Sequence, residues 1–221
     1  MKRIDFVNDE YYHIYNRGVD KRNIFPDQRD YVRFLKGLRL FNASGMTWLS
    51  LLNDKVEQYE KGKRLVDVLC YCLMPNHYHI LIKQKSDSGI TTFMRKLNTG
   101  YTMYFNIRYK RTGRLFENKF KAVHVKNDDF LRHLSRYIHM NPLDLTGEDW
   151  RNGKILKTKT ALKYLRNYPW SSLASYVSVK TRNRIINKGI LAEIFSNKTY
   201  NNFVIDWMNR AFDNIEQLTL E

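Results

Sequence analysis

Two histidines separated by one residue, His77 and His79, have the spacing that most directly suggests chemistry in this sequence. They lie in the run MPNHYHILI, whose apolar and aromatic residues are typical of a strand. Residues i and i+2 of a strand project from the same face, so both imidazoles can converge on one divalent cation while Tyr78 points the other way. The pattern favours metal ligation over the structural alternative, in which both histidines pack in the core or lie on the surface.

A later segment, FLRHLSRYIHMN, offers a candidate nucleophile and a third ligand. Tyr137 and Asn141 are four residues apart, a spacing that places both side chains on one face of a helix. Asn141 could give its carbonyl oxygen to the cation, while Tyr137 presents its phenol one turn earlier. His139 lies off that face and is the alternative third ligand. By position alone, Tyr137 is interpreted as a core tyrosine, and His13 is not expected to join the histidine pair.

Alternating strand and helix patterns predict the elements that position these residues. Strands are predicted at 11–16, 66–75, 77–83 and 122–126, and helices at 27–41, 48–61, 89–109 and from Asp128 to Asn141. Asp27 is the predicted N-cap of the first helix, and Asp128 and Asp129 fit the N-cap and first turn of the last. This order is typical of an α+β fold with a ferredoxin-like, RRM-like antiparallel sheet.

The charge of the chain points to a polyanionic partner. Its 221 residues include 38 Lys and Arg against 22 Asp and Glu, which gives a net charge of +16. Residues 83–126 hold eleven basic residues with only two acids, and residues 151–188 hold ten with none, whereas 127–150 is net −3. Basic blocks with interleaved aromatic residues favour nucleic-acid binding over a merely solvated surface.

Several classes of protein are excluded by composition. The two cysteines, Cys70 and Cys72, alternate along an apolar strand and are interpreted as reduced core residues rather than a disulfide framework. An apolar run long enough to cross a bilayer is missing, and 14% aromatic residues are too many for a disordered basic tail. We therefore expect a soluble, intracellular protein with no membrane partner.

Five runs in this order resemble the single-tyrosine HUH transposases of the IS200/IS605 type, and more narrowly the REP-associated tyrosine transposases: PNHYHI, YTMYFN, GRLFENKFK, RYIHMNP and YPWSS. The resemblance covers roughly residues 11–176, and it implies a protein of the bacterial cytoplasm that is associated with the nucleoid. It implies a catalytic domain at 1–150 with an HUH endonuclease fold, followed by a basic, aromatic extension at 151–221 packed on the core. It also implies that His77 and His79 form the metal-binding pair, with Asn141 as third ligand and Tyr137 as the catalytic nucleophile.

The activity implied by this resemblance is cleavage and rejoining of single-stranded DNA near hairpins. Tyr137 would attack the scissile phosphate to give a 5′-phosphotyrosine intermediate and a free 3′-OH, with Mg²⁺ or Mn²⁺ stabilising the developing charge. A DNA-binding or RNA-binding regulator on the same fold, without catalysis, is the alternative.

The expected partner is single-stranded DNA with a hairpin, such as a REP-like sequence or an insertion-sequence end. A monomer is favoured by the C-terminal extension, with a homodimer as the alternative. Lys and Arg side chains bind phosphate without reading sequence. The residues expected to contact DNA are Arg17, Lys21, Arg95, Lys96, Arg108, Lys110, Arg111 and Arg114, with the block 151–188 as a second grip.

Overall fold

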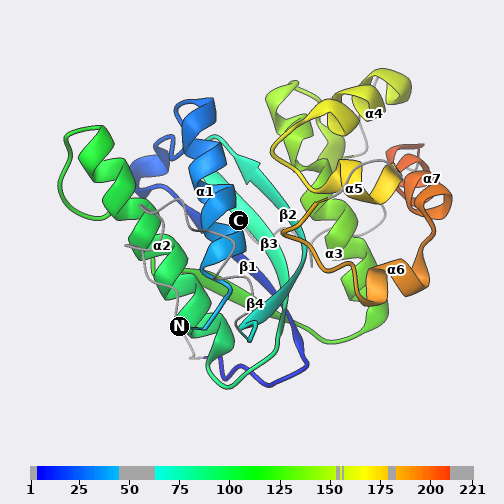
Figure 1. The fold of residues 1–221 in the computed structure, drawn as a ribbon. Coiled ribbons are helices and arrows are strands. Elements are labelled where there is room, and N and C mark those ends of the chain that lie inside the picture. The colour runs from blue at the N-terminus through cyan, green and yellow to red at the C-terminus, as the bar shows by residue number, and fades with distance from the viewer. Residues whose placement is uncertain (1–3, 45–62, 153–154, 156, 179–182, 210–221) are drawn as a thin grey trace.

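The computed structural model describes residues 4–44, 63–152, 155, 157–178 and 183–209. Within them, one antiparallel sheet has the strand order β2-β3-β1-β4 and comprises β1 (Tyr11–Arg17), β2 (Val66–Met74), β3 (His77–Gln84) and β4 (Lys121–Val125). Helices α1 (Gln28–Leu40) and α2 (Gly89–Arg108) cover one face of the sheet, and α3 (Asp128–Met140) covers the other (Figure 1). The predicted ferredoxin-like α+β fold is therefore confirmed.

The elements that follow α3 lie with it on the same side of the sheet (Figure 1). They are the short 3₁₀ segments η4 (Asn141–Leu145) and η5 (Trp150–Asn152) and the helices α4 (Thr158–Asn167), α5 (Leu173–Val177), α6 (Ile190–Ile194) and α7 (Asn197–Asn209). Leu162, Leu173 and Tyr200 from these helices share one buried apolar cluster with Leu134 and Ile138 of α3. Residues on both sides of position 150 therefore contribute to the same core.

The alternation of side chains along the strands separates two hydrophobic cores. Tyr78 and Ile80 face α1 and α2, where they pack with Phe34. Leu81 of the same strand faces α3. An irregularity in β2 between Val68 and Cys70 shifts the pairing with β3 and places both Leu69 and Cys70 on the α3 side. The face that carries His77, His79 and Leu81 is thus the face covered by α3.

Local sequence signals account for the helix boundaries. Asp27 caps α1 as predicted, and Asp30 returns the bond by accepting from the Asp27 backbone N–H, which completes a capping box. The cap of α3 differs from the prediction: the side chain of Asn127 accepts from the backbone N–H of Phe130 at 2.8 Å. Asp128 and Asp129 instead occupy the first turn, where their negative charges stabilise the helix by interacting with the positive end of its dipole.

The outer edge of β2 is covered by the C-terminal part of the chain. Leu73 N donates to the carbonyl of Trp170 at 2.9 Å, and Ser172 N donates to the carbonyl of Tyr71 at 3.0 Å. The Trp170 ring stacks on Tyr31 of α1 with centroids 4.4 Å apart. The segment YPWSS therefore closes the sheet edge and also contacts the opposite layer of helices.

The two cysteines are buried and free, as expected, and burial raises the pKa of both thiols. The predicted helix at 48–61 lies outside the described residues. In the part of the chain that the structure describes, every helix is too short or too polar to span a membrane.

Candidate active site

The histidine pair lies at the beginning of β3, immediately after the turn at Pro75 and Asn76. The rings of His77 and His79 are 5.0 Å apart between centroids and nearly perpendicular, at 88°. Tyr78 is fully buried on the opposite face, where its hydroxyl donates to Asn98 Oδ1 at 2.9 Å. The predicted alternation around Tyr78 is therefore confirmed.

His13 of β1 contacts this pair, contrary to the sequence-based expectation. Its Nε2 lies 2.9 Å from Nδ1 of His79, and both rings are buried. The register explains the contact, because Tyr15 pairs with His79 and the next residue on the same face of β1 is His13. Burial, and secondarily the adjacent His79, holds the pKa of His13 well below its usual value. His13 is therefore neutral at physiological pH.

Tyr137 of α3 projects toward the histidine face of the sheet. Its ring meets His79 edge to face, with centroids 5.8 Å apart and an interplanar angle of 87°. On another side it contacts Trp150, with centroids 5.7 Å apart. Only 5% of Tyr137 is exposed. The amphipathic pattern of α3, with Leu131, Leu134 and Ile138 buried, is what turns Tyr137 toward the sheet.

Asn141 follows Tyr137 by one helical turn and is completely buried. Its side-chain N–H donates to the carbonyl of Tyr137 at 2.8 Å. Its Oδ1 is buried and has no hydrogen-bond partner among the described residues. A buried carbonyl oxygen normally has a partner, so this atom is suited to bind a cation.

The donor set fits a divalent cation. His77 Nδ1 lies 2.7 Å from Asn76 Oδ1 and His79 Nδ1 lies 2.9 Å from His13, so each imidazole would bind a cation through Nε2. Imidazole nitrogens and a carboxamide oxygen are ligands for metals such as Mn²⁺. Among the described residues, no group of three or more His, Cys, Asp and Glu side chains is placed to hold a metal. Asn141 offers a carboxamide oxygen, a ligand type outside that set of four side chains, one helical turn from Tyr137.

His139, the alternative third ligand, belongs to a different buried network. Its Nδ1 lies 2.6 Å from the Tyr200 hydroxyl, and its Nε2 lies 2.8 Å from Ser172 Oγ. Burial lowers the pKa of His139 to about 3. Because both ring nitrogens bond to residues of the C-terminal extension, the geometry favours Asn141 over His139 as a ligand.

Arg151 lies beside Tyr137, although the sequence analysis grouped it with the C-terminal basic block. Its guanidinium carbon is 5.8 Å from the centre of the Tyr137 ring and 4.6 Å from that of Trp150. Ten residues, 141–150, separate Arg151 from the end of α3, and they include the 3₁₀ segment η4 and the first residue of η5. No periodic pattern spans that interval, so the contact had no signal in the sequence.

A narrow cavity opens next to the histidine pair. Its lining includes Tyr15, Arg17, His77, His79, Glu117 and Lys121. Arg17, one of the residues expected to contact DNA, forms an ion pair with Glu117 at 3.0 Å and keeps 36% of its side chain exposed. The structure therefore brings Arg17 and the histidine pair to the same cavity.

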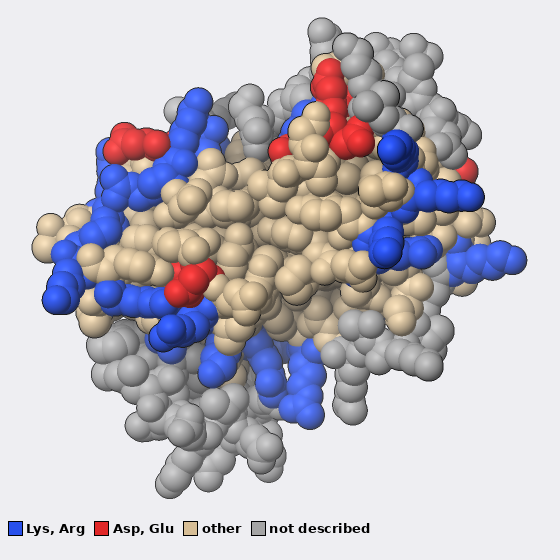
Figure 2. Space-filling view, turned by 90° about the horizontal axis from the view of Figure 1, so that it is seen from above, with Lys and Arg blue, Asp and Glu red and all other residues tan. Residues whose placement is uncertain are grey.

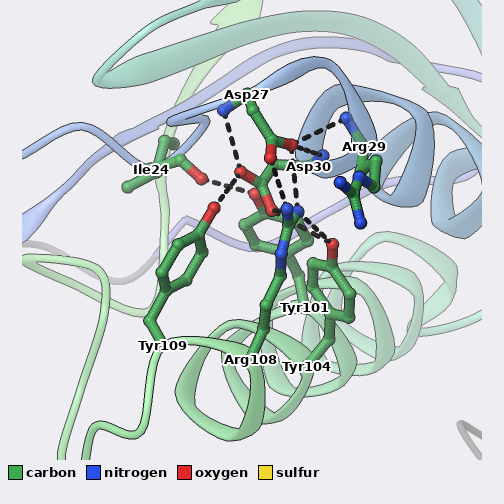
Figure 3. Close-up of polar contacts among 8 residues, drawn as sticks. All are labelled: Ile24, Asp27, Arg29, Asp30, Tyr101, Tyr104, Arg108 and Tyr109. Carbon is green, nitrogen blue, oxygen red and sulfur yellow. Dashed lines mark hydrogen bonds and ion pairs between the residues drawn. The ribbon is translucent and has the colours of Figure 1, made fainter.

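Arg108 occupies an internal network rather than an open surface (Figure 3). Its Nη1 donates to Asp30 Oδ1 at 2.7 Å, and its guanidinium also pairs with Asp27. Tyr104 and Tyr109 complete the network by donating to the buried Asp30 carboxylate at 3.1 and 2.7 Å. These bonds hold the end of α2 against the beginning of α1.

The remaining residues expected to contact DNA lie at the surface to different degrees. Lys96 donates to the carbonyl of Ala43 at 3.3 Å, and Arg111 donates to Asn106 Oδ1 at 2.9 Å. The exposed members are Lys21, Arg95, Lys110 and Arg114. Figure 2 shows one face of the molecule on which Lys and Arg side chains gather toward the periphery and acidic side chains are fewer.

A second basic surface is a groove of about 550 Å³ between α1 and the segment that carries YPWSS. Its described lining contains no acidic residue and includes the cations Lys36, Arg39, Arg166 and Arg184. Arg166 and Arg184 belong to the basic block at 151–188, whereas Lys36 and Arg39 come from α1. The fold thus brings two distant parts of the sequence to one basic groove.

Comparison with known proteins agrees with this geometry. A family model described as "Transposase IS200 like" matches residues 45–141, and none of the curated proteins matches the chain. The solved structure of a REP-associated tyrosine transposase bound to a REP hairpin has a TM-score of 0.53 and 12% identity, over 85% of this chain and 90% of that one. This likeness shows a shared fold.

A tRNA(His) guanylyltransferase from Saccharomyces cerevisiae reaches a TM-score of only 0.36 at 8% identity, over 99% of this chain and 86% of that one, and carries no argument. The family match, by contrast, includes both histidines of the pair, Tyr137 and Asn141. Residues 45–141 of this 221-residue chain are thus similar to the IS200-like transposase family, and the fold of the chain is shared with a REP-associated tyrosine transposase.

Proposed function

We propose that this protein cleaves single-stranded DNA near hairpins and rejoins it through a phosphotyrosine intermediate on Tyr137. The observation that carries the proposal is the edge-to-face contact of Tyr137 with His79, which brings a phenol to the face of a histidine pair. The similarity of residues 45–141 to a transposase family model, and a fold shared with a transposase bound to a REP hairpin, support the substrate class.

In the proposed reaction, Oη of Tyr137 loses its proton to solvent and bonds to the scissile phosphorus. The bond from phosphorus to the 3′ oxygen breaks, and that oxygen takes up a proton to give a free 3′-OH. The phosphate remains joined to Tyr137 and to the 5′ oxygen of the downstream strand. Because the phosphoryl bond is retained, another 3′-OH can reverse the step and join a new strand.

The residues around Tyr137 orient this step. The His79 and Trp150 rings contact the tyrosine from two sides, and the Asn141 side chain is bonded to the Tyr137 carbonyl. Mg²⁺ or Mn²⁺ bound by His77, His79 and Asn141 would supply positive charge that polarises the scissile phosphate. His13 would hold the His79 ring in the required orientation through the bond to Nδ1.

DNA would be held at two surfaces. Arg17 lies at the cavity beside the histidine pair and would contact a strand bound there. The groove with Lys36, Arg39, Arg166 and Arg184 would bind backbone phosphates of the hairpin through charge alone. We propose that the first surface positions the strand and the second provides affinity.

Covalent capture tests the proposal. The protein is incubated with Mn²⁺ or Mg²⁺ and single-stranded oligonucleotides, which carry inverted repeats from the DNA flanking the coding sequence. Denaturing electrophoresis then separates free protein from protein joined covalently to DNA. The wild type is expected to form a protein–DNA adduct, and Tyr137→Phe is expected to abolish the adduct while retaining DNA affinity. Tyr164→Phe, which removes the hydroxyl of a half-buried tyrosine on α4, is the matched control.

The alternative function is that of a regulator that binds structured DNA or RNA without cleaving it. A regulator would bind the hairpin with the same affinity and give no adduct with either divalent cation. An adduct that persists in Tyr137→Phe would instead show that another residue is the nucleophile.

A further inference from the structure

The guanidinium of Arg151 is fixed on two sides by residues that follow α3. Its Nη1 forms an ion pair with Asp144 Oδ1, and the same oxygen accepts from Trp150 Nε1 at 2.5 Å. The Trp150 ring, which is 1% exposed, lies 4.6 Å from the guanidinium carbon. Asp144 and Trp150 therefore hold the planar group in one orientation.

The third side of this guanidinium faces Tyr137. The guanidinium carbon lies 5.8 Å from the centre of the Tyr137 ring. Burial by itself lowers the pKa of Arg151, but Asp144 and then the Tyr137 phenol outweigh it, so the pKa is raised and the group stays charged. An arginine cannot act as a proton acceptor under these conditions, so its chemistry here is that of a fixed cation.

One donor nitrogen of Arg151, Nη2, is buried and makes no hydrogen bond of ordinary geometry with the described residues. Besides the ion pair with Asp144, the guanidinium interacts with the Tyr137 phenol. A guanidinium has five N–H donors in a rigid fork, and the fork matches the oxygens of a phosphate. The Arg151 side chain is 25% exposed, against 5% for the whole Tyr137 residue, so DNA that approaches the phenol reaches the guanidinium as well.

From this geometry we infer that Arg151 is a catalytic residue that binds a non-bridging oxygen of the scissile phosphate while Tyr137 attacks it. The inference rests on the proposed function. The tyrosyl oxygen bonds to phosphorus, the 3′ oxygen leaves with a proton from solvent, and Arg151 neither gains nor loses a proton. Its charge stabilises the phosphoryl oxygens as negative charge develops in the transition state.

Asp144 has a supporting part in this arrangement. It binds the edge of the guanidinium at Nη1 and the indole of Trp150, and both contacts restrict the rotation of Arg151. A preorganised donor of this kind loses little entropy when the substrate binds. Asp144 is therefore a positioning residue that acts through Arg151.

Single-turnover adduct formation with saturating DNA tests the inference. Removal of one preorganised donor to a developing oxyanion typically costs about 10²–10³-fold in rate, and we expect Arg151→Ala to slow adduct formation by about that factor. DNA affinity is expected to change far less. Arg151→Lys, which keeps the charge without the fork, should retain part of the rate. Arg132→Ala, on the surface of α3, is the matched control.

A modified substrate separates a phosphate contact from a packing role. A methylphosphonate at the scissile position replaces one non-bridging oxygen by a methyl group, and its two stereoisomers remove different oxygens. If Arg151 binds one of them, the rate ratio of wild type to Arg151→Ala should fall toward unity for a single stereoisomer. A merely structural arginine would give the same ratio with the phosphodiester and both stereoisomers, which overturns the inference.

The outcomes for the inference and for the proposed function are distinct. A wild type that forms no adduct overturns the proposed function and the inference with it. A wild type that forms the adduct, with Arg151→Ala equally fast, overturns only the inference. Circular dichroism of Arg151→Ala and Arg151→Lys shows whether a slow variant is folded. For a folded variant, the ratio of the wild-type rate to the variant rate with each stereoisomer shows whether Arg151 contacts the phosphate.

Discussion

His13 and His79 are joined by a hydrogen bond of 2.9 Å between Nε2 and Nδ1, in a part of the sheet where both rings are buried. The bond fixes which nitrogen of His79 would bind a cation. Loss of a residue that is hydrogen-bonded to a metal-binding histidine typically lowers metal affinity by about 10–100-fold. We therefore expect His13→Ala to weaken Mn²⁺ binding by about that factor. Isothermal titration without DNA measures it. The control is His124→Ala, which removes a partly exposed histidine of β4 that pairs with Glu10. Equal Mn²⁺ affinities in the wild type and both variants would contradict the prediction.

The buried His139 is expected to make stability depend on pH. Its pKa is lowered to about 3 in the folded state, whereas the ordinary value is about 6.5. Below pH 6.5 this histidine is protonated in the unfolded chain but stays neutral in the folded chain. The free energy of unfolding therefore falls as the pH falls from 7 toward 3. One such group contributes about 2 kcal/mol to the loss between pH 7 and pH 5.

Urea unfolding at pH 5 and pH 7 checks this dependence. His139→Asn removes the titrating group, so the difference between the two pH values should shrink by about 2 kcal/mol relative to the wild type. The variant is less stable at both pH values because the bonds to Tyr200 and Ser172 are disturbed. An unchanged pH difference would show that His139 is not the group responsible.

The Arg108 network predicts a stability defect. Arg108→Met leaves the Asp30 carboxylate buried without its cation, so we expect a lower melting temperature. The double variant with Asp30→Asn removes that buried charge and should recover part of the loss. Thermal melts test this prediction, and hairpin affinity is measured in parallel. If Arg108→Met weakened binding without lowering the melting temperature, Arg108 would be a DNA contact instead.

The basic groove predicts a change in the salt dependence of DNA binding. Arg166→Ala with Arg184→Ala removes two cations that line the groove. Each phosphate contact that is lost should reduce the slope of log affinity against log salt by about 0.7–0.9. A titration of hairpin DNA from low to high salt measures the slope. The double variant Arg29→Ala with Lys126→Ala removes the same charge from exposed positions outside the groove, and an equal change there would contradict the prediction.

What could be predicted from the sequence depended on local periodicity. The i, i+2 spacing places His77 and His79 on one face because a strand alternates, and the i, i+4 spacing places Asn141 next to Tyr137 because a helix turns. These relations hold whatever the rest of the fold does. The contact of Tyr137 with His79 required the additional knowledge that α3 covers that face of the sheet.

The parts that could not be predicted depend on register and on irregular chain. His13 reaches His79 only because β1 pairs with β3 in one particular register, and nothing within either strand specifies it. Arg151 lies in the short 3₁₀ segment η5, and the chain between it and α3 changes conformation at η4 and again after Leu145, so no single period relates Arg151 to Tyr137. The charge pattern gives no sign of the contact either, because Arg151 belongs to the basic block 151–188 whereas Tyr137 belongs to the acidic segment 127–150.

The backbone bonds from Leu73 to Trp170 and from Ser172 to Tyr71 occupy the peptide groups of β2 that an edge strand would otherwise present. A second chain therefore cannot extend the sheet there by strand addition. A second copy that added a strand to this sheet would have to do so at the opposite edge, at β4. Loss of the YPWSS segment would remove this protection and expose a strand-pairing edge beside the basic groove.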